Sequence, residues 1–421
     1  MKYVLFYLLL LLSPGAFAQA DPATVYFSGD KLFATVTKYT SLGEHRTGTP
    51  TDFATSEWLG KELAGVGYEV KYFEFKLRQF FPESVTVTDA KGKTLQAFPF
   101  WYVKDSIAQT VEGVLTTQTT DVKNKVVLVN LGGDQPGQSE QKLLKMLATI
   151  IDGGAKAVIG YAKNEVDEIA AINAPKAAKP WAVPVVLVSA GDAVKLQGQE
   201  GKTVKVSVKG TFKNVTARNV YGTIGHGEQY VVISTPISGW FSCGGERGPG
   251  IATWLALAKW AAAKKLPYTF VFTGNSGHEL GGWGAKAFLE GGAPPVDKTR
   301  LWVHLGAGIA TLAWQATPQG LVKQNTVDAK RNFFYSQSVA SSYEQAFKDV
   351  PGNKWSTRER SAGELVYVIE KGYPNVAGAA YSHPYFHMRS DDASKTSPAI
   401  LEEVATAFRN FIDNETRRQA N

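Results

Sequence analysis

The chain has 421 residues, a formal net charge of +7 and one cysteine. This length exceeds the usual size of one hydrophobic core, so two domains are expected. The basic residues are scattered and lack a repeated order of neighbouring aromatics, which argues against nucleic-acid binding. A single cysteine excludes an intramolecular disulfide.

Residues 1–20, MKYVLFYLLLLLSPGAFAQA, have the layout of a cleaved secretory signal. One lysine precedes a short apolar run, a Ser-Pro-Gly break follows, and alanines stand at positions 16, 18 and 20. The apolar run is too short to remain as a membrane-spanning helix. We therefore predict an exported chain without a membrane span, located in the periplasm or outside the cell.

The remaining chain alternates between helical and strand-like patterns. Amphipathic spacing predicts helices over 52–67, 140–155, 250–265, 281–292 and 397–415. Short β-type runs predict strands over 111–117, 125–133, 156–163, 181–190 and 202–210. Because this β-rich block lies between the first helix and the later ones, it is predicted to be a domain inserted into an α/β body.

Several stretches together resemble one family. Residues 42–70, LGEHRTGTPTDFATSEWLGKELAGVGYEV, are similar to the opening of secreted zinc peptidases of the M28 class, and KNKVVLVNLGG, GGAKAVIGYAK and VPVVLVSAGDA resemble a protease-associated (PA) domain. RNVYGTIGHGEQYVVIS, PYTFVFTGNSGHELGGWGAKAFL and GYPNVAGAAYSHPYFHMRSDD continue the family's order. The resemblance implies a three-layer α/β/α sandwich with a mainly parallel mixed sheet, formed by 21–95 and 215–421, and a PA-like insert at 96–214.

The resemblance also implies a two-zinc centre, but this sequence departs from it. The family holds its first zinc with a histidine of a His-x-Asp motif and with a later aspartate. The corresponding positions here are Pro236, with Ser238 in place of the motif's aspartate, and Gly306. Since proline and glycine have no coordinating side chain, the first metal site is predicted to be missing.

The second metal site retains a donor at each expected position. By resemblance, its ligands are Glu246, Glu279 and His387, with Asp391 four residues after the histidine. Carboxylate and imidazole groups are suitable zinc ligands. The prediction is one zinc ion at most, bound by these three side chains. A metal-free alternative pairs Glu246 with Arg247, and a purely structural one makes these residues helix caps or packed core groups.

Two further residues are catalytic candidates. In the family a glutamate precedes the ligand glutamate and acts as general base; here His278 precedes Glu279. An imidazole, with an ordinary pKa of about 6.5, can perform the same proton transfer. Cys243, in the glycine-rich segment GWFSCGGERGPG, is either a nucleophile paired with His278 or a buried thiol in a turn.

The preferred function is therefore an exported hydrolase of amide or ester bonds, with catalytic candidates His278, Glu279 and Cys243 and either one zinc ion or no metal. The alternative is a non-catalytic protein that binds a peptide or carbohydrate on the same fold. Glutaminyl cyclases are similar in using one zinc but keep a glutamate where His278 stands. The expected ligand is a small molecule, peptide or carbohydrate in the cleft, and the oligomeric state is left open.

Overall fold

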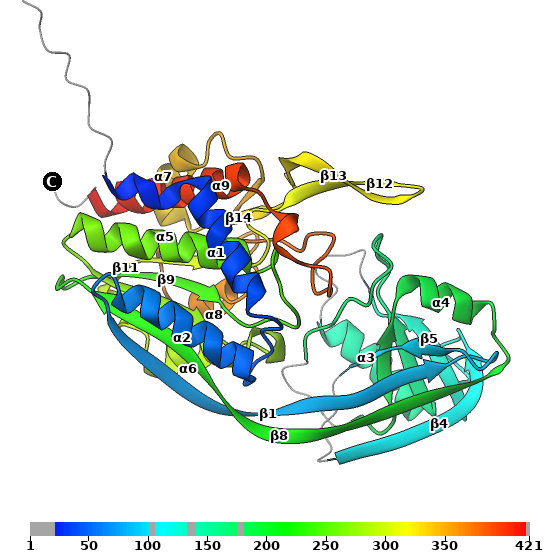
Figure 1. Cartoon of the computed structure of the whole chain (residues 1–421). Coiled ribbons are helices and arrows are strands. Elements are labelled where there is room, and N and C mark those ends of the chain that lie inside the picture. The colour runs from blue at the N-terminus through cyan, green and yellow to red at the C-terminus, as the bar shows by residue number, and fades with distance from the viewer. Residues whose placement is uncertain (1–21, 101–105, 133–139, 175–180, 418–421) are drawn as a thin grey trace, which may run out of the picture.

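The computed structural model describes residues 22–100, 106–132, 140–174 and 181–417, which form two lobes joined by two long strands (Figure 1). The predicted secretory signal, residues 1–20, lies outside the described residues. Within the described ranges, no helix is long and apolar enough to cross a membrane. The two lobes are named the body and the insert below.

The body is built on a mixed sheet whose central strands are parallel. β9 pairs in parallel with β10 and β11, and β11 pairs in parallel with β16. These strands are nearly continuous apolar runs because helices cover both of their faces. The body strands in spatial order are β15 (Asn353–Ser356), β14 (Asn332–Tyr335), β16 (Val376–Ala380), β11 (Thr299–Leu305), β9 (Tyr230–Pro236), β10 (Thr269–Asn275) and β8 (Thr203–Ile224).

Helices pack on both faces of this sheet and enclose two apolar cores. The first face carries α1 (Gly29–Ser41), α2 (Pro50–Ala64), α5 (Gly248–Lys264), α7 (Ala340–Ala346) and α9 (Pro398–Arg417), and the second carries α6 (Trp283–Gly291) and α8 (Leu365–Glu370). The helices predicted over 52–67, 250–265, 281–292 and 397–415 are confirmed as α2, α5, α6 and α9. The helix α1 was not predicted.

The insert is itself an α/β unit, not simply a β-rich one. Strands β4, β5, β6 and β7 are parallel, and α3 and α4 pack on opposite faces, each over its own apolar core. Its elements are β2 (Thr94–Gln96), β3 (Phe98–Pro99), β4 (Ser106–Thr116), β5 (Lys125–Asn130), α3 (Glu140–Asp152), β6 (Ala157–Tyr161), β7 (Val185–Val188) and α4 (Ala190–Gln197). The helix predicted over 140–155 is α3.

Two long antiparallel strands connect the lobes. β1 (Glu69–Thr88) pairs with β8 from Glu69 opposite Thr223 to Thr88 opposite Lys205. The expected domain boundary between residues 214 and 215 therefore falls inside β8, and the one between 95 and 96 falls inside β2. Because the same hydrogen-bonded strands belong to both lobes, the sheet continues from the body into the insert.

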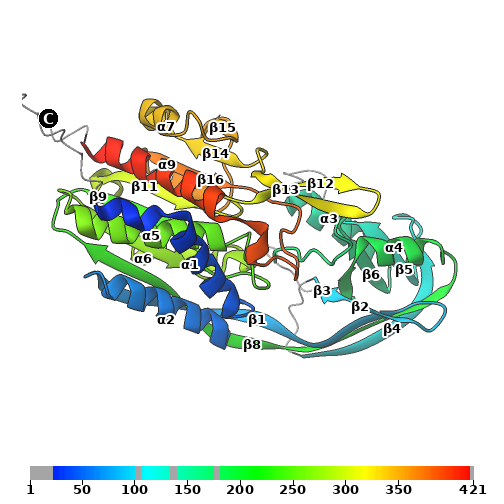
Figure 2. The same cartoon turned by 45° about the horizontal axis from the view of Figure 1, so that its top comes forward.

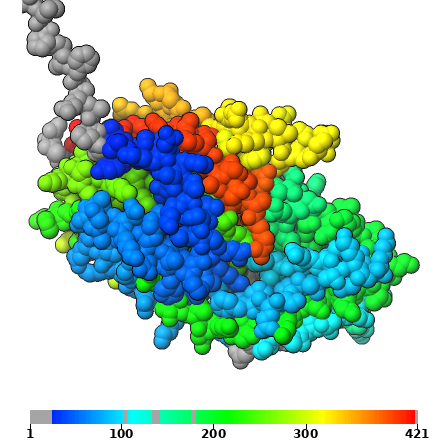
Figure 3. Space-filling model, in the orientation of Figure 1, coloured from blue at the N-terminus to red at the C-terminus, as the bar shows by residue number. Residues whose placement is uncertain are grey.

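The lobes also meet away from these strands. The hairpin β12 (Leu312–Thr317) and β13 (Gly320–Val327) extends from the body on the side of the insert (Figure 2). The space-filling view shows the orange-red late segment of the body adjoining the blue-green surface of the insert (Figure 3). The side of the body that carries this hairpin and the late segment therefore faces the insert.

Candidate functional site

The residues predicted to bind metal lie on loops that follow parallel strands. Glu246 follows β9 and directly precedes α5, Glu279 follows β10, and His387 follows β16. The carboxyl ends of parallel strands meet at one edge of a sheet, which brings these loops together. Nε2 of His387 lies 3.3 Å from Oε1 of Glu246. A single guanidinium group contacts Glu246 and Glu279.

That guanidinium belongs to Arg247, which is fully buried at the centre of the site. Its Nη2 lies 2.8 Å from Oε1 of Glu246 and donates to Oε1 of Glu279 at 2.7 Å, while Nε donates to the Ser238 carbonyl at 2.9 Å. The contact between Arg247 and Glu246 is an ion pair, and its geometry is not that of a hydrogen bond. The ion pair between Glu246 and Arg247 that the sequence suggested is present.

The charges of this cluster stabilise one another. Burial would raise the pKa of Glu246, but attraction to Arg247 and then to His387 holds that pKa well below its usual range. Burial would lower the pKa of Arg247, but the carboxylates of Glu246 and Glu279 raise it above the ordinary value. Glu246 is therefore ionised and Arg247 is a permanent cation between two anionic side chains.

Position 238 supports the carboxylate of Glu279. The Ser238 hydroxyl donates to Oε2 of Glu279 at 2.7 Å and accepts from the backbone N–H groups of Gly277 and His278 at 3.0 and 3.2 Å. Gly277 has a φ of +80°, a left-handed conformation that glycine adopts without strain. Ser238 thus fixes Glu279 beside Arg247.

The first metal site has no room for a replacement ligand at position 306. A Cβ added to Gly306 would lie 2.5 Å from the Ala379 carbonyl oxygen of the neighbouring strand β16. Pro236 ends the buried strand β9. Side chains at these two positions therefore supply no donors to a metal.

The second set of donors does not fit zinc while Arg247 holds it. Zinc binds carboxylate oxygens at about 2.0–2.2 Å. An ion bound to the Glu246 and Glu279 oxygens would lie less than about 5 Å from Nη2 of Arg247, a fixed positive charge. Arg247 already supplies the cation that these carboxylates require.

His387 is oriented by the insert. Its Nδ1 donates to the Ala171 carbonyl at 2.8 Å, which leaves Nε2 facing Glu246 without a hydrogen-bond partner among the described residues. This arrangement suits a metal ligand whose second nitrogen is held by a carbonyl.

Asp391 organises the backbone of the Glu246 loop. Its two carboxylate oxygens accept from Gly245 N at 2.8 Å and Glu246 N at 3.0 Å. Within the described part of the chain, the only histidine, cysteine and acidic side chains with three donor atoms within 4.8 Å of one another are Cys243, Glu246 and Asp391. In this set, Asp391 is held by backbone N–H groups and Glu246 by Arg247.

Cys243 lies in the main core of the body and is 1% exposed. Burial, followed by the nearby charges of Glu246 and Asp391, raises the pKa of its thiol well above the ordinary value. A nucleophilic cysteine needs a lowered pKa and access to substrate. The environment of Cys243 therefore favours the buried-thiol interpretation over the predicted catalytic role.

His278 has a partner that the sequence did not reveal. Its Nδ1 lies 3.0 Å from Oε1 of Glu364, and Asn275 donates to the other oxygen of that carboxylate at 3.0 Å. Hydrogen bonding and attraction from His278 hold the pKa of Glu364 below its usual range, although burial alone would raise it. The only signal in the sequence was an acidic residue before α8, and nothing linked it to His278.

The insert covers the centre through backbone hydrogen bonds. Ala171 N donates to the His387 carbonyl at 3.0 Å, and Ala174 N donates to the Glu279 carbonyl at 2.8 Å. The Trp240 indole donates to Oδ1 of Asn173 at 3.0 Å. We call residues 171–174 the strap. It lies directly against two of the predicted metal-ligand residues.

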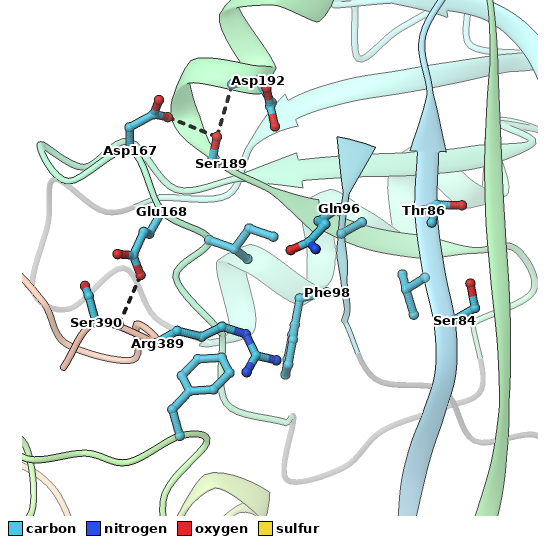
Figure 4. A pocket seen from close by; sticks show the side chains of 14 residues that line it. Ser84, Thr86, Gln96, Phe98, Asp167, Glu168, Ser189, Asp192, Arg389 and Ser390 are labelled. Carbon is cyan, nitrogen blue, oxygen red and sulfur yellow. Dashed lines mark hydrogen bonds between the residues drawn. The ribbon is translucent and has the colours of Figure 1, made fainter. Parts of the chain in front are cut away.

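A cavity of about 800 Å³ lies beside the covered centre, between the insert and the body (Figure 4). The body contributes Phe241, Arg389 and Ser390, from the same two loops that carry Glu246 and His387. The insert and the connecting strand supply the other walls. This cavity is large enough for a small organic ligand.

Comparisons with known proteins identify similar folds. The chain resembles an aminopeptidase from Aneurinibacillus sp. strain AM-1, with 17% identity, TM-score 0.66, and coverage of 93% of this chain and 94% of that chain. It also resembles a zinc aminopeptidase from Bacillus subtilis, with 15% identity, TM-score 0.72, and coverage of 92% and 95%.

A peptidase M28 precursor from Shewanella amazonensis is similar at 14% identity and TM-score 0.72, with 94% of each chain covered. No protein-family model and no curated protein matches the sequence. At these identities the likeness shows a shared mixed α/β fold. The PA assignment of the insert remains a prediction.

Proposed function

We propose that this chain is an exported, metal-independent protein on an M28-peptidase-like fold, and that it binds a peptide or carbohydrate ligand without cleaving it. The observation that carries the proposal is the position of Arg247. Its guanidinium contacts both carboxylates that would bind the second zinc, and it is fully buried. The one-zinc form of the hydrolase predicted from the sequence requires those carboxylates to be available.

Two other observations support binding over hydrolysis. The strap hydrogen-bonds to the backbone of Glu279 and His387, so the centre is covered by the chain itself. The cavity beside it is lined by side chains of the insert and the body. Export is proposed from residues 1–20, and the assignment of the insert as PA-like from its resemblance.

The experiment is a paired measurement on the purified mature chain. Zinc content is measured by elemental analysis after mild dialysis, and hydrolysis of aminoacyl chromogenic substrates is measured with added zinc, with added cobalt and with a chelator. We expect well under one zinc per chain and no turnover above background in all three conditions. One zinc per chain together with chelator-sensitive turnover would disprove the proposal.

His278 supports a second candidate, a metal-free hydrolase. With Nδ1–H donating to Glu364, Nε2 is available to accept a proton from water, and the side chain is partly exposed. Turnover in the presence of chelator that is lost in His278→Ala would establish this function. It ranks second because Arg247, the buried cation of the site, is already paired with Glu246 and Glu279.

A further inference from the structure

The cavity between the insert and the body has an acidic wall. Three carboxylates line it, Asp167 and Glu168 from the loop after β6, and Asp192 from the first turn of α4 (Figure 4). Arg389 is the one cationic side chain among the described lining residues. The formal charge of the lining is therefore −2, from three acidic groups and one basic group, in a chain whose net charge is +7.

Each of these carboxylates keeps one oxygen that has no partner among the described residues. Oδ1 of Asp167 accepts from the Ser189 hydroxyl and Gly191 N at the start of α4. Oε2 of Glu168 accepts from Ser390 N at 3.2 Å, and Oδ1 of Asp192 accepts from the exposed Lys195 at 2.8 Å. These hydrogen bonds fix the wall in position, and the remaining oxygens of Glu168 and Asp192 accept no hydrogen bond from a described residue.

Arg389 does not neutralise this wall. Its guanidinium pairs with Glu44 at the surface of the body and lies 4.6 Å from the centre of the Phe241 ring. Among the described residues its ion-pair partner is Glu44, and it forms no ion pair with any of the three carboxylates. Lys195 pairs with Asp192, so the negative charge without an ion-pair partner among the described residues is that of Asp167 and Glu168.

The opposite side of the cavity is aromatic. Phe98 packs against Phe241 and Trp240 in edge-on contacts, with ring centroids 5.8 and 5.5 Å apart. Phe98 and Phe241 both line the cavity. The hydrogen bond from Trp240 to Asn173 fixes this group of rings against the insert. Apolar surface and fixed carboxylates therefore face a common space.

We propose that this cavity binds an organic cation, an ammonium or guanidinium group attached to an apolar body, as in a peptide with a basic residue next to an aromatic one. The cation pairs with the free carboxylate oxygens, and the apolar part contacts Phe98 and Phe241. The inference rests on the proposed binding function and selects a basic peptide over a carbohydrate. A neutral sugar would leave the negative charge of the wall uncompensated.

The test uses two peptides that differ only in charge, acetyl-Phe-Arg-amide and acetyl-Phe-citrulline-amide, with maltose as a carbohydrate probe. Binding to the mature chain is measured by titration calorimetry at low salt. We expect the arginine peptide to bind at least about tenfold more tightly than the citrulline peptide, because a carboxylate pairs more strongly with a charged donor than with a neutral one.

Variants locate the site. Glu168→Gln and Asp192→Asn should each weaken the arginine peptide by about fivefold or more, whereas Glu83→Gln, on an exposed carboxylate paired with Lys209, should leave binding unchanged. Equal binding of both peptides, or no binding of either at millimolar concentration, overturns the inference. Preferential binding of maltose also overturns it and leaves the binding function standing. Chelator-sensitive cleavage of the peptide overturns the proposed function itself.

Discussion

Replacing Arg247 by methionine tests whether a guanidinium group has taken the role of a metal ion. The substitution removes the charge but keeps an unbranched side chain of similar reach. Glu246 and Glu279 would then be two buried carboxylates without the group that they contact at 2.8 and 2.7 Å. We expect a less stable protein that has gained affinity for zinc.

The size of the effect follows from the burial of the cluster. Arg247 is 1% exposed, Glu246 0% and Glu279 2%. Removing one partner of a buried ion pair costs about 3–5 kcal/mol. At about 2 °C per kcal/mol for a domain of this size, the melting temperature should fall by roughly 6–10 °C. Zinc should restore much of this loss in the variant, since Glu246, Glu279 and His387 are then free to bind it.

The assay is thermal unfolding with and without equimolar zinc, combined with elemental analysis. Arg331→Met is the matched control, because Arg331 is also buried in the body but pairs with Glu403 and not with Glu246 or Glu279. The control should lose stability and gain nothing from zinc. If the wild-type chain is stabilised by zinc as strongly as Arg247→Met, or if Arg247→Met is as stable as wild type without zinc, the reasoning is refuted.

Three further outcomes are expected. The Cys243 thiol should resist alkylation in the native chain and react only after unfolding, because it is buried and its pKa is raised; rapid native labelling would contradict this. Burial raises the pKa of Asp52 from 3.8 to about 7, so ionisation of this group destabilises the native state as pH rises from 4 to 7. Over that pH range Asp52→Asn should gain stability relative to wild type, by up to about 4 kcal/mol in urea unfolding. A difference in stability that does not change with pH would exclude the titration of Asp52. Ala171→Pro removes the N–H that donates to the His387 carbonyl and should speed hydrogen exchange in the strap, whereas unchanged exchange would show that the strap does not depend on this bond.

Much of the fold was accessible from the sequence because it depends on local patterns. The spacing of apolar residues located α2, α5, α6 and α9, and the helix predicted over 250–265 is observed as Gly248–Lys264. The absence of donors at Pro236 and Gly306 is a property of the residue types alone. The grouping of Glu246, Glu279 and His387 came from the resemblance to zinc peptidases, and it agrees with their place on loops that follow parallel strands of one sheet.

The state of the site was decided by tertiary structure. The sequence left open whether Glu246 would bind a metal or pair with Arg247. Only packing places that guanidinium on Glu279 as well, 32 residues further along the chain. Glu364, 86 residues from its partner His278, gave no local signal. Contacts between residues so distant in sequence arise when sheet and helices bring their loops together.

The boundary between the lobes is another feature that the sequence did not determine. A change of composition indicated an insert, but β8 runs through the expected boundary without interruption because its pairing with β1 continues across both lobes. The strap over Glu279 and His387 comes from that insert and is made by backbone groups. Main-chain hydrogen bonds do not depend on side-chain type, so the sequence carries no mark of them, and only the folded arrangement of the two lobes covers the centre.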